Sequence, residues 1–185
     1  MKYILLLALV ITISSYNMDR ARTICRELKR QGYTNAGIAG VLGNLEHESH
    51  LDPGKYQDSF KDDVGLSDKE YVRRVNSGKY PKDKFVYDEV GFGLAQWTYW
   101  EYKQYLYNTC RGKYGNVAHF GCQLDYLIKG IQKKTALINI LTKNNNVDYC
   151  TEKFLNLYER AEDPQLQSRK NYANDYYNQL VSRGC

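Results

Sequence analysis

The chain has 185 residues and a formal net charge of +5, with residues of both charge signs interspersed along its length. This is the size of one domain with a full hydrophobic core. No run of Lys or Arg of the kind that follows a phosphate backbone is present, so nucleic acid is not an expected partner.

The N-terminus has the pattern of a secretory signal. Lys2 supplies a positive charge, an almost unbroken apolar run follows, and Ser14 and Ser15 are small residues suited to cleavage. The apolar run is shorter than the roughly 20 residues that a membrane-spanning helix needs. We therefore expect a signal over residues 1–15, a secreted single domain over residues 16–185, and no stable membrane insertion once the signal is removed.

Five cysteines follow this segment, and disulfides are expected in an oxidising compartment. Cys110 and Cys122 bracket a short loop that contains glycine, so they are the first expected pair. Cys185 is the last residue and is expected to pair with Cys150 or Cys25. One thiol must stay unpaired, and the absence of a C-x-x-C motif argues against zinc.

Apolar residues at helical spacing, with polar caps and Gly or Pro stops, predict helices along most of the chain. In chain order the helices are expected over residues 19–31, from 34 or 35 to about 53, and over 67–75, 98–107, 120–131, 133–141, 147–160 and 166–183. A short strand, Phe85 to Tyr87, is expected to enter a glycine turn. The predicted fold class is mainly α, with at most a small β-hairpin near residues 80–95.

The second expected helix ends with two acidic residues. On a helical wheel Glu46 and Glu48 lie roughly 90° and 70° from the centre of the apolar stripe, on opposite flanks, so the wheel alone does not separate them. A glutamate half-buried against apolar side chains has a raised pKa, which a general acid for a glycosidic bond needs near neutral pH. The alternative is a solvated glutamate at a helix terminus.

Metal chemistry is not predicted at this helix end. His47 and His50 are three residues apart, whereas zinc-binding metalloprotease helices place two histidines four residues apart. No metal is therefore expected at this site, and no organic cofactor is implied elsewhere in the chain.

A second motif, Gly91-Phe92-Gly93-Leu94-Ala95-Gln96-Trp97-Thr98, is a glycine-rich turn followed by polar and aromatic residues. Glycine allows a positive φ and a close approach of backbone to ligand. Gln96 can both donate and accept hydrogen bonds, and Trp97 offers a flat face that can stack on a sugar ring. The alternative for Trp97 is packing in the core.

Together the two motifs resemble the catalytic helix and the cleft of the phage-tail lysozyme family, which is related to goose-type lysozymes and lytic transglycosylases. The resemblance rests on Glu48-Ser49-x-Leu51-x-Pro53 and on the Gly-x-Gly-Leu-Ala-Gln-Trp-Thr string. Residues 123–127 and 154–160, followed by Arg169 and Ala173, resemble the C-terminal helices of the family. One departure is Tyr99-Trp100-Glu101, where family members often have a glycine and a basic residue.

The resemblance implies a lysozyme-like α+β fold that is mainly helical, and a muramidase that cuts the MurNAc-β-1,4-GlcNAc bond of peptidoglycan. Glu48, directly before the serine of the motif, would be the general acid. Ser49, Gln96, Trp97 and Thr98 would bind the glycan strand. The protein is expected to act as a monomer on peptidoglycan.

The motifs do not identify the second catalytic carboxylate. A base about 6.5–9.5 Å from the acid would give inversion, and a nucleophile at about 5–5.5 Å would give retention. Asp88 and Glu89 are the first candidates because they precede the glycine turn. Other candidates lie earlier in the chain: Asp52, Asp58, Asp62 and Asp63.

Two alternatives to a muramidase remain at this point. A lytic transglycosylase works with one glutamate, because the C6 hydroxyl of the muramic acid attacks intramolecularly and leaves a 1,6-anhydro product. A peptidoglycan- or chitin-binding protein would use the same cleft without turnover.

Overall fold

The computed structural model describes residues 18–60, 65–161 and 164–185, so the expected signal over residues 1–15 lies outside it. The chain folds as two compact units: one contains the segment that ends at Leu51 together with Lys134–Cys185, and the other is Asp52–Lys133. The expectation of a single domain over residues 16–185 stays a prediction. The described residues are mainly helical, which confirms the predicted fold class.

In the first unit a helix covers residues 18–30. The elements that follow in this unit are α2 (Asn35–Ser49), α9 (Thr135–Lys143), α10 (Val147–Phe154), the π-helical turn η3 (Leu155–Glu159), α11 (Leu166–Gln179) and η4 (Val181–Arg183). In the second unit they are η1 (Asp58–Phe60), α4 (Asp68–Ser77), α5 (Lys82–Tyr87), α6 (Trp100–Tyr105), η2 (Leu106–Arg111), α7 (Gly112–Tyr114) and α8 (Phe120–Gln132).

The caps expected from the sequence set several of these boundaries. The Thr34 side chain accepts a hydrogen bond from the backbone N–H of Gly37 and begins α2. The Ser67 side chain does the same for the N–H of Glu70 at the start of α4. Both contacts satisfy N–H groups that have no partner within the helix, and both confirm the predicted N-termini.

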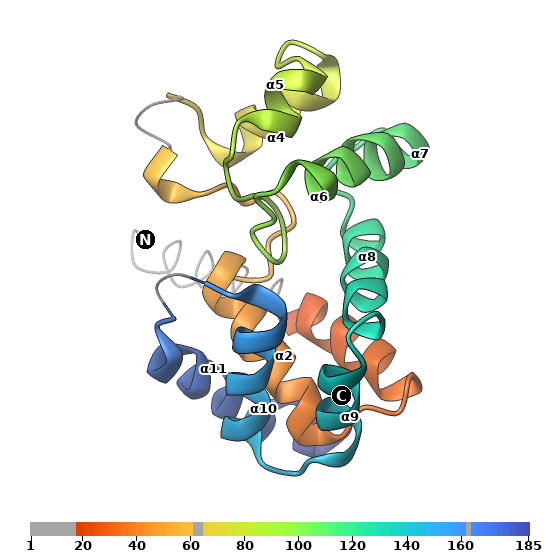
Figure 1. Cartoon of the computed structure of the whole chain (residues 1–185), viewed down its shortest axis with the longest axis vertical. Coiled ribbons are helices and arrows are strands. Elements are labelled where there is room, and N and C mark those ends of the chain that lie inside the picture. The colour runs from red at the N-terminus through yellow and green to blue at the C-terminus, as the bar shows by residue number, and fades with distance from the viewer. Residues whose placement is uncertain (1–17, 61–64, 162–163) are drawn as a thin grey trace, which may run out of the picture. The chain divides into compact units, whose positions relative to one another are not determined.

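Helix α2 is the centre of the first unit, with α10 and α11 beside it (Figure 1). Three glycines at every third position make this close packing possible. A Cβ atom on Gly40 would lie 2.8 Å from the backbone nitrogen of Thr151, and one on Gly43 would lie 2.6 Å from Ala173 Cβ. A Cβ on Gly37 would overlap the Leu141 carbonyl. The helices therefore approach α2 at a distance that only glycine permits.

The second unit has an aromatic core. The rings of Tyr56 and Tyr71 stack with centroids 4.6 Å apart, and Phe92 lies 5.8 Å from Tyr71 and 5.5 Å from Phe85. All four side chains are fully buried. Some of the many tyrosines of the chain are therefore core residues.

The expected strand over Phe85 to Tyr87 is wrong, because these residues form the second half of α5. Pro81 precedes the first turn, its carbonyl accepts a hydrogen bond from the Phe85 N–H at 2.9 Å, and the turn buries Phe85 and Val86. A short apolar run does not distinguish a strand from a buried helical turn. Among the described residues, the β-structure consists of isolated bridges, and Phe92 pairs in them with Tyr56 and Trp97.

Two disulfides are present. Cys110–Cys122 confirms the first expected pair, and Cys25–Cys185 resolves the choice left open for the C-terminal cysteine. Cys150 is the buried free thiol.

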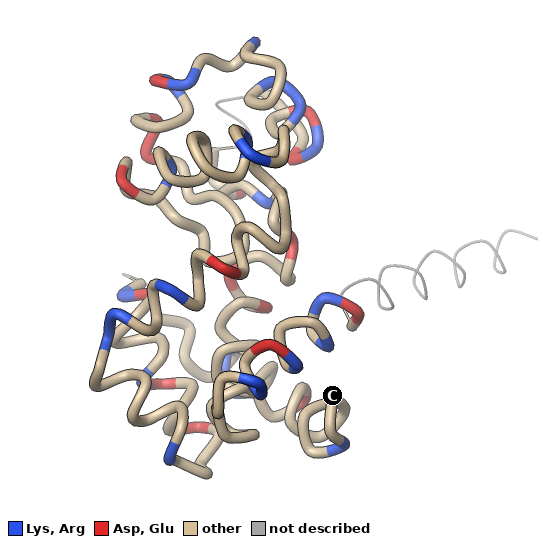
Figure 2. Tube along the Cα trace, turned by 90° about the vertical axis from the view of Figure 1, so that its right-hand side faces the viewer, with Lys and Arg blue, Asp and Glu red and all other residues tan. Residues whose placement is uncertain are grey.

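Charges of both signs are distributed over each unit (Figure 2). None of the helices in the described ranges combines the length and the apolar character of a membrane span.

Candidate active site

Glu48 lies in the last turn of α2 and forms an ion pair with Arg169 of α11. The distance from Arg169 Nη2 to Glu48 Oε1 is 2.6 Å, and the exposed fractions are 15% for the Glu48 side chain and 2% for that of Arg169. The carboxylate is partly buried, as expected. Its contact is a guanidinium, however, and not the purely apolar surface that the helical wheel suggested.

The Arg169 guanidinium is held in place from two other directions. Its Nε donates to the Pro164 carbonyl at 2.8 Å, and its Nη1 donates to Asn44 Oδ1 at 3.2 Å. The Asn44 amide in turn donates to the carbonyls of Gly40 and Thr151, at 2.8 and 3.1 Å. A buried network fixes the arginine, so the position of its anionic partner is fixed as well.

Glu46 has a different environment. The Tyr176 hydroxyl donates to Glu46 Oε2 at 2.7 Å, and His50 Nδ1 lies 3.1 Å from Glu46 Oε1. Burial, and then the charge of Glu46, raise the pKa of Tyr176 well above its usual range. The structure therefore separates two glutamates that the wheel could not: Glu46 faces a phenol and an imidazole, and Glu48 faces a buried cation.

A third glutamate belongs to this cluster and was missed as a site residue. Glu159, the last residue of η3, has a buried Oε1 without a hydrogen-bond partner in the described part of the chain. Burial and then the negative charge of Glu48 raise the pKa of Glu159 well above its usual range, while Arg169 acts in the opposite direction. The sequence signal lay in residues 154–160, which resemble the C-terminal helices of the family but did not indicate a site residue.

Ser49, an expected glycan contact, is 1% exposed. Its hydroxyl donates a hydrogen bond to the Leu45 carbonyl, one turn earlier in α2, at 3.2 Å. In this structure the serine side chain contacts its own helix. A glycan contact by Ser49 stays a prediction.

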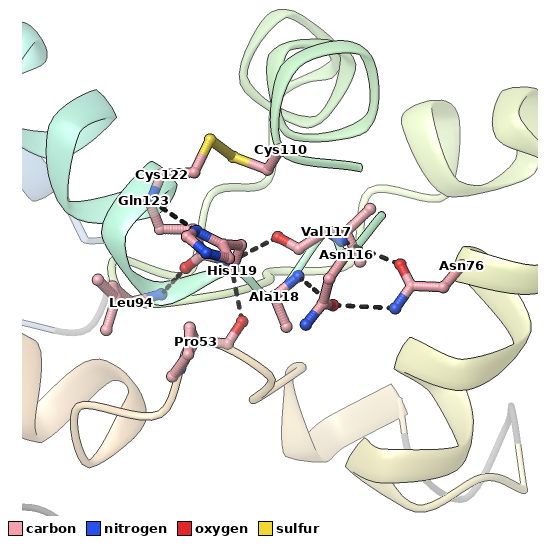
Figure 3. Close-up of a disulfide and its surroundings, with 10 residues drawn as sticks. All are labelled: Pro53, Asn76, Leu94, Cys110, Asn116, Val117, Ala118, His119, Cys122 and Gln123. Atoms are coloured by element: carbon pink, nitrogen blue, oxygen red, sulfur yellow. Dashed lines mark hydrogen bonds between the residues drawn. A yellow bond between two sulfur atoms is a disulfide. The ribbon is translucent and has the colours of Figure 1, made fainter. Parts of the chain in front are cut away.

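In the second unit Gln123 of α8 is bonded to the Gly91–Thr98 motif at Leu94 (Figure 3). Gln123 is fully buried, and its Oε1 accepts a hydrogen bond from the Leu94 N–H at 3.0 Å. Its Nε2 donates to the carbonyls of Pro53 and Val117, both at 2.9 Å. Gly93, with φ of +79°, passes so close that a Cβ would lie 2.5 Å from Gln123 Oε1. The glycine in this turn is therefore required by a close approach as well as by its backbone angle.

The three predicted glycan-binding residues of the motif also make internal contacts. Gln96 Nε2 donates to the carbonyls of Lys55 and Gly93, at 3.2 and 3.1 Å. Thr98 donates to the Gln96 carbonyl at 3.1 Å. Trp97 is 5% exposed, and its ring lies 5.5 Å from that of Tyr126. The tryptophan thus packs as a core residue, which was the alternative considered for it.

Asp88, a candidate second carboxylate, is enclosed by donors. The hydroxyls of Tyr71 and Tyr80 donate to its Oδ2 at 2.8 and 3.1 Å, and the Val90 N–H donates to its Oδ1 at 3.0 Å. Lys103, which is fully buried, also contacts Oδ1. Burial lowers the pKa of Lys103, and the Asp88 charge opposes that shift. This is a buried, fully coordinated ion pair, which serves the core of the second unit.

The other candidates for the second carboxylate differ in exposure. Glu89 is exposed, with a left-handed φ of 58°. Asp58 pairs with Lys55 at 2.7 Å on the surface, and Asp52 Oδ1 accepts from the Gly54 N–H at 2.9 Å. Asp62 and Asp63 lie outside the described residues. Within the described ranges no group of three or more His, Cys, Asp or Glu side chains could hold a metal ion.

Comparison with known proteins places the chain in a family. A family model described as phage tail lysozyme matches residues 19–180, which include Glu48, the Gly91–Thr98 motif, Glu159 and Arg169. No curated protein matches the sequence. Because the family match covers most of the chain and both compact units, the chain belongs to the phage tail lysozyme family.

Proposed function

We propose that the protein is a secreted muramidase that hydrolyses the MurNAc-β-1,4-GlcNAc bond of peptidoglycan, with Glu48 as the general acid. Membership of the phage tail lysozyme family supports a lysozyme-like action on peptidoglycan. The observation that carries the assignment of Glu48 is its ion pair with Arg169, in which a buried and fixed cation holds a partly exposed carboxylate at the end of α2.

The chemistry follows from that placement. A general acid must be held in one orientation beside the glycosidic oxygen. Arg169 fixes the Glu48 carboxylate through Oε1, and 15% of the Glu48 side chain stays exposed. Gln96 and Thr98 are proposed to contact the glycan, and Trp97 to support the turn that carries them. No metal or organic cofactor takes part in this proposal, and the protein is proposed to act as a monomer.

A second candidate, a lytic transglycosylase, is favoured by the environment of Asp88. All of its described contacts are hydrogen-bond donors in the core of the second unit. To act as a base, Asp88 would first have to break its contacts with Lys103 and two tyrosines. Glu89 stays the exposed candidate for a base. If no carboxylate activates water, the muramic C6 hydroxyl can attack instead.

Digestion of purified peptidoglycan, followed by mass spectrometry of the products, tests this proposal. The wild type is expected to release reducing muropeptides and Glu48→Gln none. The matched control is Glu46→Gln, on the same helix with a side chain 14% exposed, which should keep its activity. Anhydromuropeptides from the wild type would assign the transglycosylase. Binding without any product would refute both enzymes and leave a peptidoglycan-binding protein.

The extracellular location is proposed from the N-terminal segment and tested separately. Expression of the full chain in a secreting host should yield a protein that begins near Tyr16, as N-terminal sequencing would show. Intact Met1 on the purified protein would contradict the proposed signal.

A further inference from the structure

Four large aromatic side chains of the second unit lie at its surface. Tyr87 ends α5, and Tyr99, Trp100 and Tyr102 lie in the first turn of α6 or directly before it. These residues are between 41% and 71% exposed. A single exposed aromatic residue is ordinary, whereas a cluster of them is typical of a binding surface. The four residues are called the aromatic surface below.

The rings of the aromatic surface contact one another. Tyr87 and Trp100 stack with their centroids 6.4 Å apart and their planes at 30°, and Tyr99 packs edge-on against Tyr102 at 6.2 Å. The start of α6 does not require these residues. Tyr99 occupies the N-cap position without a side-chain hydrogen bond, where Ser, Thr, Asp or Asn would satisfy a free backbone N–H. The stability of the helix therefore does not explain why aromatic residues stand here.

The two helices that carry the aromatic surface are tied together. Helix α5 packs against α6. Lys103 of α6 is fully buried, contacts the carboxylate of Asp88 at the end of α5, and donates to the Val90 carbonyl at 2.9 Å. A ligand that stacks on these rings would therefore meet helices that are already fixed, and little ordering would oppose its binding.

A row of rings connects the aromatic surface to the glycine turn. Trp97 of the turn lies 5.5 Å from Tyr126, and Tyr126 lies 6.3 Å from Tyr102 of the aromatic surface. Tyr99 also follows directly after Thr98, the last residue of the motif. The aromatic surface is therefore continuous with the turn that is proposed to contact the glycan.

The charges of the aromatic surface favour a neutral partner. In the Tyr99–Tyr105 segment the charged side chains are Glu101, which is exposed, and Lys103, which is buried. The charge of Glu101 acts on the neighbouring rings, because it adds to burial in raising the pKa of Tyr126. The lysines of α5 lie over rings outside the surface, Lys82 over Tyr107 and Lys84 over Tyr80. An exposed negative charge without an exposed cation in this segment disfavours polyanions and anionic lipids.

We propose that the aromatic surface is a second binding site for the glycan strand, on which the N-acetylated sugar rings of peptidoglycan stack. The apolar face of a pyranose can lie flat on an aromatic ring, while the phenol and indole groups at the ring edges hydrogen-bond its polar substituents. N-acetylglucosamine is uncharged, as the charges of the surface require. The inference rests on the proposed function for the identity of the polymer, and it adds a place where the strand is held without being cut.

Calorimetric titration tests the inference, with peptidoglycan glycan strands freed of their stem peptides as the probe. The titrations use the Glu48→Gln protein, so that the strands stay intact. Adding Trp100→Ala should weaken the Kd by about 10–30-fold, as truncation of an aromatic anchor does. Trp100→Phe keeps a flat ring and should retain most of the affinity, whereas Trp100→Leu is apolar without a flat ring and should bind as weakly as Trp100→Ala. The matched control is Tyr149→Ala of α10, an exposed tyrosine of the first unit, which should bind like its parent.

A second variant and two further measurements decide between occupants. Tyr99→Ala should also weaken binding, and it replaces Trp100→Ala if circular dichroism shows that variant to be unfolded. Unchanged affinity in the folded variants would overturn the inference. A wild-type dimer that Trp100→Ala converts to a monomer in sedimentation velocity, with glycan affinity unchanged, would assign the surface to a second copy of the chain. Binding to phosphatidylcholine vesicles that is lost in Trp100→Ala, again with glycan affinity unchanged, would assign it to a membrane.

Failure of this inference and failure of the proposed function give different results. Digestion of peptidoglycan by the wild type, together with unchanged affinity in Trp100→Ala and Tyr99→Ala, would refute the second binding site and leave the muramidase. Absence of products from the wild type, together with glycan binding that depends on Trp100, would refute the muramidase and leave the aromatic surface as a glycan-binding site.

Discussion

The sharpest prediction of the fold concerns a single methyl group, in Gly43→Ala. Gly43 lies in the middle of α2, where the backbone of α11 comes close to it. A Cβ atom at this position would lie 2.6 Å from Ala173 Cβ, from the Ala173 nitrogen and from the Arg169 carbonyl oxygen. These are atoms of a helix backbone and its first side-chain carbon, so no flexible side chain can move aside.

The magnitude follows from two opposing contributions. An ordinary carbon–carbon contact is about 3.5–4.0 Å, so α11 must move by roughly 1 Å. Overpacking of a core costs about 1–3 kcal/mol, and the rigidity of α11 places Gly43→Ala near the upper end. Replacing glycine by alanine inside a helix contributes about 0.8–1 kcal/mol in the other direction. We expect a net loss of about 2 kcal/mol of unfolding free energy, a factor of about 30 in the folding equilibrium.

Gly112→Ala is the matched control. Gly112 is helical and exposed, and a Cβ atom there would meet nothing within 4 Å. Only the helix-propensity contribution remains, so this variant should gain about 0.5–1 kcal/mol. Guanidinium unfolding followed by circular dichroism would compare the two variants. A Gly43→Ala protein as stable as Gly112→Ala would show that α11 does not pack on α2 as described, and would refute the reasoning.

Three further predictions concern other buried groups. Asp88→Asn should lower the unfolding free energy by about 3–5 kcal/mol, measured by denaturant titration, because it leaves the buried Lys103 ammonium without its anionic partner; an unchanged stability would contradict a structural role. Gln123→Leu should lose three hydrogen bonds, one from the Leu94 N–H of the glycine turn and two to the carbonyls of Pro53 and Val117, at about 1–3 kcal/mol for each unsatisfied backbone group, and amide exchange of the Leu94 N–H should become fast. Burial raises the pKa of the Cys150 thiol to about 11, so the folded protein should resist alkylation at pH 8 and react only when unfolded; rapid labelling of the native protein would contradict this.

The secondary structure was predictable where local rules govern it. The Thr34 and Ser67 caps follow from side chains that accept hydrogen bonds from nearby backbone N–H groups. The strand predicted near Phe85 failed because a three-residue apolar run carries no periodicity, and the packing of the aromatic core decided the outcome.

The acidic site was only partly predictable for a related reason. Glu48 stands in a local motif, and its position in that motif distinguished it from Glu46. Its ion-pair partner, Arg169, lies more than 100 positions away in the sequence. Nothing in the neighbourhood of Glu48 in the sequence indicates that a buried cation faces it. The buried ion pair of Asp88 with Lys103 could not be predicted from the sequence either, because a lysine in an aromatic-rich helix is normally expected at the surface.

These long-range contacts explain why family resemblance extended to segments without evident chemistry. Gln123 holds the glycine turn through the Leu94 N–H, and Arg169 of α11 holds the Glu48 carboxylate. Gly43, Asn44 and Arg169 then connect the packing of α2 and α11 to the orientation of one carboxylate, because Asn44 orients the guanidinium and Gly43 sets how near α11 can come. A change in that packing should therefore disturb the orientation of the Glu48 carboxylate more than it disturbs glycan binding. We expect folded variants of the α2–α11 interface to lose kcat while KM is retained.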